Sequence, residues 1–351
     1  MIFPYPREFP ADAIERRVPD PDTARTLVRE RRPDVLALLE RRRGRLATSM
    51  AHSPDLIERG EDAVLMAFCR IAFRHGTWGE DYHAYHNEAH ALEIVDARMD
   101  CLIGAVGAAT LSPSDWFLLT LFGAAHDLRQ REAPEYSAGV GSNERASVEE
   151  TFRILQACGF TRQRDPELFA AIELMIAGST FDARPTSPRE YNTADVIVQS
   201  GGALAQKLDT KLDKYSEGWR DDARVVHALD LALIAADLDT ANVAEPFPRF
   251  MASSERLCLE REMRSHRDPA SRASAQPVLS FLTEGTTRYF FELHRFSSDV
   301  GRRTFAQAKE ENAAKLRTLT AQLSSRWTER APPASGTVVL DAFREIAAVI
   351  G

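Results

Sequence analysis

Helical periodicity dominates the pattern of hydrophobic and polar positions along this chain, and two-residue alternation is hard to find. Apolar residues recur at three- and four-residue spacing, which is typical of helices with one buried face. The pattern predicts helices over the following ranges: 22–47, 54–75, 86–106, 113–127, 143–157, 166–177, 193–212, 222–238, 244–264, 276–297, 300–325 and 337–349. The predicted fold class is therefore all-α.

The segment LSPSDW begins the most hydrophobic of the predicted helices. Ser112 can cap this helix, Pro113 suits its first position, and Asp115 favours the positive end of the helix dipole. The residues that follow, WFLLTLFGAAHD, are apolar on nearly every side. We therefore expect this helix at the centre of the fold.

The chain divides into three predicted parts. Residues 1–50 form an Arg-rich helical segment, and residues 51–328 form one compact multi-helix domain. Residues 329–351 form a linker, which begins ERAPPASG, and a C-terminal helix. A length of 351 residues fits one large domain with such appendages.

Composition and charge narrow the classes of protein that fit. The 44 Lys and Arg stand against 52 Asp and Glu, a formal net charge of −8, so we expect no nucleic-acid partner. No apolar run approaches the roughly 18 residues of a membrane span, so we expect no membrane association. The four cysteines form no CxxC motif, and the N-terminus MIFPYPREFP lacks a signal-peptide core. A cytoplasmic location is the expectation.

Histidines and carboxylates stand at the ends of the most apolar predicted helices. His86 and His90 are four residues apart, so on a helix they share one face. His126 and Asp127 end the most hydrophobic helix, and Asp237 ends the apolar run VVHALDLALIAAD. Burial of such groups carries a desolvation penalty, which a bound metal cation would offset.

Each of these features alone has a structural explanation, because a helix-end Asp is often a cap and a buried His is often a hydrogen-bonded core residue. Taken together they supply two imidazoles and two carboxylates from three helices: His90, His126, Asp127 and Asp237. A mixed nitrogen and oxygen set suits Zn²⁺, Mn²⁺ or Fe²⁺. A carboxylate can also bridge two ions in a hydrolytic centre. We predict a divalent-metal site at these four residues.

Several short segments resemble motifs of known enzymes. Tyr85-His86-Asn87-Glu88-Ala89-His90 resembles the YHNxxH motif of the class I cyclic nucleotide phosphodiesterases, and Ala125-His126-Asp127 resembles their HD motif. Asn143-Glu144-Arg145-Ala146-Ser147 resembles a segment of small bacterial HD phosphohydrolases. Ala236-Asp237-Leu238 and QPVLSF at 276–281 resemble the phosphodiesterase segments that carry the last metal-binding Asp and the nucleobase-binding glutamine. The resemblance spans residues 75–320 and implies a compact HD/PDEase-like helical domain.

The resemblance implies a metal-dependent phosphohydrolase that cleaves a phosphodiester, with a small-molecule cyclic nucleotide as the expected substrate. It implies two divalent ions (Zn, Mn, Mg or Fe), a metal-bridging hydroxide as nucleophile, and Asp127 as the ligand shared by both ions. His86 would be the general acid, and Glu144 would hold His86 in the correct tautomer. The expected substrate-binding residues are Gln276, Leu279 and Tyr85.

The sequence departs from the phosphodiesterase pattern at three positions. Gln130 stands where a further histidine follows the HD motif, Thr240 where an Asn often contacts the base, and Leu279 where an aromatic ring clamps the purine. An altered purine pocket leaves a nucleotide phosphomonoesterase open as an alternative. An HD-type di-iron oxygenase would need more histidine ligands than the sequence offers. A non-catalytic HD-like binding module would not need a general acid such as His86.

Overall fold

The structure is a computed structural model that describes residues 2–4, 8–46, 54–130, 141–182, 202–327 and 332–351. The described residues are predominantly helical, so the predicted all-α fold class is confirmed. The strands in the described residues form one short antiparallel pair, β1 (Phe181–Asp182) and β2 (Gly202–Ala203), in which Phe181 lies opposite Ala203.

The chain forms two compact units, and these do not follow the three predicted parts. The first unit comprises Met1–Tyr82, His86–Asp239 and Ser297–Gly301, and the second comprises His83–Tyr85, Thr240–Phe296 and Arg302–Gly351. The N-terminal helices belong to the first unit because they pack on its long helix α5. The C-terminal helix belongs to the second unit because it packs on α13 and α14.

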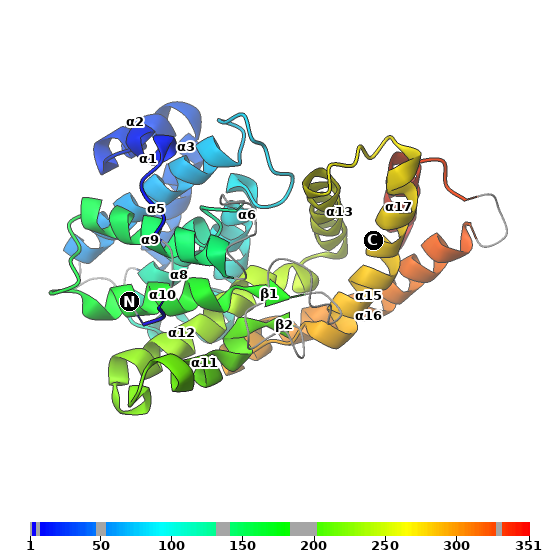
Figure 1. Cartoon of the computed structure of the whole chain (residues 1–351). Helices are drawn as coiled ribbons and strands as arrows, with labels where there is room; N and C mark the ends of the chain where they lie inside the picture. The colour runs from blue at the N-terminus through cyan, green and yellow to red at the C-terminus, as the bar shows by residue number, and fades with distance from the viewer. Residues whose placement is uncertain (1, 5–7, 47–53, 131–140, 183–201, 328–331) are drawn as a thin grey trace. The chain divides into compact units, whose positions relative to one another are not determined.

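The helices of the first unit are α1 (Ala13–Arg17), α2 (Pro21–Arg31), α3 (Pro33–Arg45), α5 (Pro54–Arg74), α6 (Glu88–Glu93), α7 (Met99–Val106), α8 (Pro113–Ala125), α9 (Ser142–Ala157), α10 (Pro166–Gly178), α11 (Leu208–Tyr215) and α12 (Ala223–Thr240). A π-helix, η1 (Ile94–Arg98), joins α6 to α7. Short 3₁₀ segments are η2 (Ala108–Thr110), η3 (Leu204–Lys207) and η4 (Trp219–Asp221). Helices α8 and α2 both pack against α5 (Figure 1).

Several predicted helices differ from the observed ones, among them the helix predicted over 276–297, which forms short α and π segments that end at Leu293. Two other differences have clear local reasons. The Arg-rich helix predicted over 22–47 is interrupted at Arg32, because Pro33 cannot donate a helix hydrogen bond and disfavours helical backbone at the residue before it. The helix predicted over 193–212 lies partly outside the described residues. Its described part is wrong at β2 and η3, and α11 begins only at Leu208.

Helix α8 lies at the core of the first unit, as its all-round hydrophobicity predicted. Every residue from Asp115 to Ala125 is buried. Trp116 and Phe122 are fully buried, and the ring of Phe117 stacks on Phe160 with centroids 5.6 Å apart. The C-terminal end of α8 is therefore held rigidly in the interior, where a polar side chain needs a partner.

The second unit contains α13 (Phe247–Arg264), α14 (Ala275–Ser280), α15 (Thr286–Arg288), the greater part of α16 (Asp299–Ser325) and α17 (Gly336–Ile350). It also holds the 3₁₀ segments η5 (Ala241–Ala244) and η6 (Arg272–Ser274), and the π-helices η7 (Phe281–Gly285) and η8 (Tyr289–Leu293). Phe250 and Phe290 stack in its core with ring centroids 5.7 Å apart. Phe247 and Phe343 are fully buried in the same unit.

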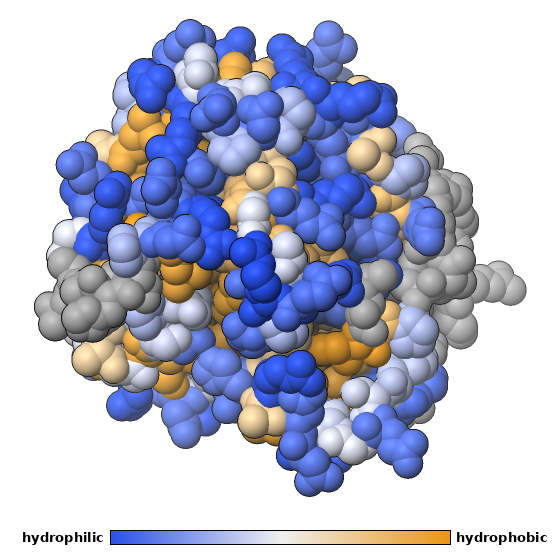
Figure 2. Space-filling view, turned by 90° about the vertical axis from the view of Figure 1, so that its left-hand side faces the viewer, coloured by the Kyte–Doolittle hydropathy of each residue, from blue (hydrophilic) through white to orange (hydrophobic). Residues whose placement is uncertain are grey.

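The surface in view in Figure 2 is mostly hydrophilic, and apolar residues appear on it as separate patches between charged side chains. This distribution agrees with helices that each bury one apolar face. None of the described helices combines the length and the apolar character that a membrane span requires.

Candidate metal centre

His126 and Asp127 emerge from the buried end of α8. The helix begins with the predicted cap, in which Ser112 Oγ accepts from the Asp115 backbone N–H at 3.2 Å and Asp115 Oδ2 accepts from the Ser112 N–H at 3.0 Å. At the other end the His126 N–H donates to the Phe122 carbonyl at 2.9 Å, so His126 still follows the helical path. Both side chains are almost wholly buried, at 3% and 6% exposure.

His90 lies in the first turn of α6. The Asn87 side chain caps that helix, since its Oδ1 accepts from the backbone N–H of Ala89 at 2.8 Å and of His90 at 3.4 Å. Because the helix begins only at Glu88, His86 precedes it. The predicted sharing of one helix face by His86 and His90 is therefore wrong, because Asn87 is a cap with extended backbone.

Two imidazoles and two carboxylates converge in the first unit. His126 Nε2 lies 3.0 Å from Asp127 Oδ2 and 3.3 Å from Asp239 Oδ1. His90 Nε2 lies 3.2 Å from Asp239 Oδ1 and 3.7 Å from Asp127 Oδ2. The buried residues His90, His126 and Asp127 form a group that could hold a metal ion. We call these three residues together with Asp239 the His–Asp cluster.

The His–Asp cluster fits a divalent cation. In a tetrahedral site with metal–ligand bonds of about 2.0–2.1 Å, the ligand atoms lie about 3.3–3.4 Å from one another. The four distances between an imidazole nitrogen and a carboxylate oxygen in the cluster, from 3.0 to 3.7 Å, bracket that spacing. The ligand atoms of His90, His126 and Asp127 all lie within 4.8 Å of one another, and Asp239 lies beside both imidazoles. Asp127 Oδ2 is buried and accepts no hydrogen bond from the described residues. His126 Nδ1 lies 3.2 Å from the Phe122 carbonyl, and donation there would leave Nε2 free to bind a metal.

Asp237, the predicted fourth ligand, has a different role in the structure. Its Oδ1 accepts from the Ser297 backbone N–H at 2.6 Å, and its Oδ2 accepts from the backbone N–H and the hydroxyl of Ser298 at 2.8 and 2.6 Å. A Cβ atom at Gly301 would lie 2.1 Å from Asp237 Oδ2, so the backbone of α16 approaches this carboxylate closely. Asp237 therefore anchors the start of α16.

Asp239 takes the place predicted for Asp237 because α12 continues to Thr240. Residues two apart on a helix point about 200° apart, so the two aspartates face nearly opposite directions. The buried guanidinium of Arg98 fixes this helix end, since Nη1 donates to the carbonyls of Leu238 at 3.1 Å and Asp239 at 2.5 Å. In the sequence, the only sign that Asp239 could be the ligand is the presence of two acids in Asp237-Leu238-Asp239. Choosing between the two aspartates requires knowing which face of α12 each one lies on.

Mutual electrostatics keeps the His–Asp cluster charged when no cation neutralises its carboxylates. Burial alone would lower the pKa of His126, but the adjacent carboxylates of Asp127 and Asp239 raise it well above its usual value. Burial alone would raise the pKa of Asp127, but His126 and the nearby His86 hold it far below its usual range. The pKa of Asp239 is likewise depressed, against its burial, by His126 and His90. A divalent cation would replace the imidazole protons as the partner of these carboxylates.

Gln130, which departs from the phosphodiesterase pattern in the sequence, holds the carboxylate of Asp127. Its Nε2 donates to Asp127 Oδ1 at 2.5 Å, which orients Oδ2 toward the two imidazoles. A side chain that orients a ligand in this way supports metal affinity without touching the metal. The three-residue spacing between Asp127 and Gln130 after a helix end is the available sequence signal.

His86 lies at the edge of the His–Asp cluster. Its ring centroid is 6.1 Å from that of His90, and its charge contributes to the depressed pKa of Asp127. The side chain is half-buried, whereas His90 and His126 are fully buried. His86 is thus close enough to interact electrostatically with the cluster and sits at a more open position.

Glu144, predicted to hold His86, lies on α9 in a different environment. Burial is the main cause of a raised pKa for this carboxyl, and the nearby charge of Asp127 raises it further. A hydrogen bond from the backbone N–H of Glu144 and the charge of Lys211 oppose that rise. That Glu144 holds His86 stays a prediction.

The three predicted substrate-binding residues belong to the second unit. Tyr85 is buried there, and its backbone N–H donates to Glu260 Oε2 at 2.9 Å. Gln276 lies exposed at the start of α14, where its Nε2 donates to Ser280 Oγ at 3.2 Å. Leu279 follows on the same short helix and is partly exposed. Gln276 therefore lies at the start of a helix on the surface, and its binding of a nucleobase stays a prediction.

Comparison with known proteins adds no family to this description. Neither a protein-family model nor a curated protein sequence matches the chain. We therefore infer function from the His–Asp cluster and its surroundings.

Proposed function

We propose that this chain is a metal-dependent phosphohydrolase that cleaves a phosphodiester. The observation that carries the proposal is the convergence of buried His90, His126 and Asp127, whose ligand atoms all lie within 4.8 Å of one another. Asp239 Oδ1 lies 3.2 and 3.3 Å from the two imidazoles and can complete the set. Such a nitrogen and oxygen donor set suits Zn²⁺, Mn²⁺ or Fe²⁺. A divalent cation bound there would supply Lewis-acid activation of water and of the phosphoryl group.

The chain's own residues supply the remaining parts of the proposed chemistry. Asp127 and Asp239 would balance the cation's charge, and Gln130 would keep the Asp127 carboxylate turned toward it. His86, which is more open than the ligand histidines, would hold the proton that passes to the departing oxygen. The position of His86 supports this assignment, because its ring centroid lies 6.1 Å from that of His90, close to the cluster but outside it.

A second cation is the finer part of the proposal. The His–Asp cluster supplies a full set of protein ligands for one ion, and a second would have to share the carboxylate of Asp127. Gln130 Nε2 already donates to Asp127 Oδ1, so the second ion would compete with that hydrogen bond. The stoichiometry of binding by the full-length chain tests this part separately, and a single ion per chain would contradict it.

The choice of a cyclic nucleotide as substrate is supported by the sequence resemblance at residues 85–90 and 125–127. The reaction class and the substrate can be tested in one panel. The full-length chain, loaded with Mn²⁺, is given 3′,5′-cyclic nucleotides, nucleoside 5′-monophosphates and bis(nitrophenyl) phosphate. The proposal predicts hydrolysis of the diesters, its loss on chelation, and its return when Mn²⁺ is restored.

Two variants make this panel decisive. Asp127→Ala removes a cluster ligand and should abolish hydrolysis, whereas Asp230→Ala removes an exposed carboxylate from the outer face of α12 and should hydrolyse as the parent does. Equal activity in Asp127→Ala and the parent would show that hydrolysis occurs elsewhere. Hydrolysis of the monophosphates alone would replace the diesterase proposal with a monoesterase.

A further inference from the structure

The turn that follows Asp127 is held by hydrogen bonds at three successive residues. The Leu128 carbonyl accepts from Arg74 Nη1 at 2.7 Å. The Arg129 backbone N–H donates to Ser147 Oγ at 3.0 Å, and the Gln130 backbone N–H donates to His75 Nε2 at 3.3 Å. The backbone on which the Asp127 and Gln130 side chains depend is therefore fixed from the end of α5 and from α9.

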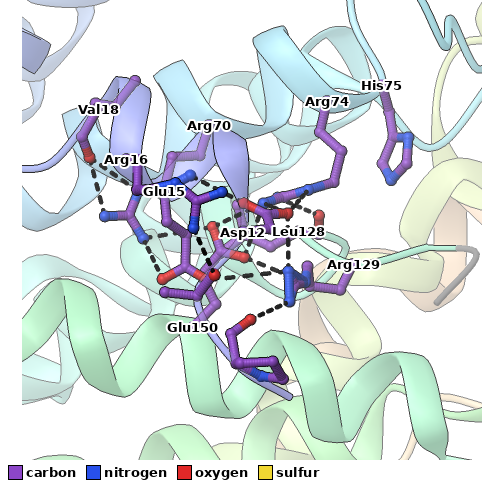
Figure 3. Close-up of polar contacts among 12 residues, drawn as sticks. Asp12, Glu15, Arg16, Val18, Arg70, Arg74, His75, Leu128, Arg129 and Glu150 are labelled. Carbon is purple, nitrogen blue, oxygen red and sulfur yellow. Dashed lines mark hydrogen bonds and ion pairs between the residues drawn. The ribbon is translucent and has the colours of Figure 1, made fainter. Parts of the chain in front are cut away.

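Part of this support comes from the N-terminal segment of residues 10–18, which we call the N-terminal clamp. Arg129 Nη1 donates to Asp12 Oδ2 at 2.9 Å, and Arg129 Nη2 donates to the Pro10 carbonyl at 3.2 Å. Arg74 Nη2 donates to the same Asp12 oxygen at 2.8 Å. One carboxylate thus joins the arginine within the turn to the arginine that holds the turn's backbone (Figure 3).

The other end of the N-terminal clamp is held in the same way. Arg70, on α5, donates from Nη2 to the Val18 carbonyl at 2.9 Å. Glu15 accepts from Arg153 at 2.6 and 2.7 Å and from Arg70 at 3.2 Å. The carbonyls at the two ends of the N-terminal clamp, Pro10 and Val18, therefore accept hydrogen bonds from arginines. The acids between them, Asp12 and Glu15, accept further hydrogen bonds from arginines. Figure 3 shows Glu15 and Arg70 close together, with the Val18 carbonyl beside the Arg70 guanidinium.

The charges in this network are closely matched and mostly buried. Four arginines (Arg70, Arg74, Arg129 and Arg153) face three acids (Asp12, Glu15 and Glu150). Arg70 and Arg129 are each 3% exposed, and Glu150 is fully buried. Loss of one acid would leave buried guanidinium groups without sufficient compensation, and they would move toward other acceptors or water.

We infer that the N-terminal clamp positions the turn that carries Asp127, so that Asp12 acts as a positioning residue for the metal centre. The inference rests on the proposed binding of a divalent cation by the His–Asp cluster. Asp12 does not touch the cluster, and its effect passes through Arg129 and Arg74 to the turn that contains Leu128 and Gln130. Partners that orient metal ligands in this way typically contribute about 10–100-fold to metal affinity.

The substitution Asp12→Asn tests this inference with little disturbance of local structure. Asp12 also caps α1, where its Oδ1 accepts from the Glu15 backbone N–H at 2.9 Å. Asparagine caps helices about as well as aspartate, so the variant can keep the cap. It loses the charge and also the Oδ2 acceptor of Arg74 and Arg129, because an amide NH₂ group only donates. Asp20→Asn is the matched control, because Asp20 caps α2 through the Thr23 N–H at 2.8 Å and is exposed.

The full-length proteins are titrated with Mn²⁺, and electron paramagnetic resonance measures the concentration of free Mn²⁺ at each step. The titration gives the dissociation constant and the number of sites. For Asp12→Asn we expect a dissociation constant raised about 10–100-fold with an unchanged number of sites at saturation. Partial misfolding would instead lower the number of sites and leave the dissociation constant as it is. Asp20→Asn should bind as the parent does, and circular dichroism should give all three proteins the same helical content.

Equal Mn²⁺ affinity in Asp12→Asn and the parent would overturn the inference and leave the metal site standing. If Asp12→Asn does not fold, Arg129→Lys provides the second test, since one ammonium group cannot reach Asp12, the Pro10 carbonyl and Glu150 together. Parental affinity in Arg129→Lys would likewise overturn the inference. A parent chain that binds no Mn²⁺ would overturn the proposed metal site itself.

Discussion

Replacement of Asp239 by asparagine separates the two aspartates at the end of α12. Asp239 Oδ1 lies 3.2 Å from His90 Nε2 and 3.3 Å from His126 Nε2, and asparagine would keep its shape but lose its charge. Four-ligand structural zinc sites bind with about 10–16 kcal/mol, or about 2.5–4 kcal/mol for each ligand if all contribute equally. Because 1.4 kcal/mol is tenfold, Asp239→Asn should weaken Zn²⁺ binding by about 10²–10³-fold.

Asp237→Asn should have the opposite profile. Its carboxylate accepts three hydrogen bonds from Ser297 and Ser298, and an amide can replace only part of that acceptor capacity. Loss of one such bond to a charged group costs about 1.5–3 kcal/mol of unfolding free energy. Zn²⁺ affinity should stay at the parental value, because the helix turns this side chain away from the His–Asp cluster.

Both quantities can be measured on the same set of proteins. Competition with a fluorescent chelator gives the Zn²⁺ dissociation constant, and urea unfolding of the metal-free proteins gives stability. Asp230→Asn, an exposed aspartate on the same helix, is the control and should change neither quantity. Weak Zn²⁺ binding in Asp237→Asn with parental binding in Asp239→Asn would refute the assignment and restore the prediction made from sequence.

Three further changes test other parts of the account. His86→Ala should keep its metal while kcat for a cyclic nucleotide falls about 10²–10⁴-fold. A nitrophenyl diester, which has a good leaving group, should recover much of that loss. Equal loss of activity on both substrates would rule out His86 as the proton donor. Gln130→Met should weaken Mn²⁺ binding about 10–100-fold by freeing Asp127 Oδ1, and unchanged affinity would remove Gln130 from the site. Burial and the charge of Lys309 lower the pKa of His294 to about 3, so below about pH 6.5 the unfolded chain takes up a proton that the folded chain refuses. The unfolding free energy should therefore fall by up to about 1.4 kcal/mol per pH unit as the pH drops from about 6.5 toward about 3, and His294→Gln should lack this contribution in urea titrations at several pH values.

The parts of the site that could be predicted from sequence are those fixed by local rules. Ser112, Pro113 and Asp115 define the start of α8, and the unbroken apolar run defines its burial, so the position of His126 and Asp127 at a buried helix end follows directly. His90 was likewise predicted beside them, although Asn87 begins its helix later than the periodicity indicated.

The remaining parts depend on contacts between distant residues or on helix phase. The choice of Asp239 over Asp237 depends on the two further residues by which α12 extends past the predicted end of the helix, and on the anchoring of Asp237 by Ser297 and Ser298. The ion pair between Arg129 and Asp12 joins residues 117 positions apart. The Arg-rich pattern predicted a helical segment over residues 1–50, and it gave no sign that Asp12 and Glu15 pair with distant arginines.

The central claim is that His90, His126, Asp127 and Asp239 hold a divalent cation, and an anomalous difference map from crystals grown with Zn²⁺ tests it most directly. We expect an anomalous peak within about 2.0–2.2 Å of the four facing ligand atoms, His90 Nε2, His126 Nε2, Asp127 Oδ2 and Asp239 Oδ1. A peak bound to Asp237 in place of Asp239, or no peak at the His–Asp cluster in a fully ordered first unit, would contradict it.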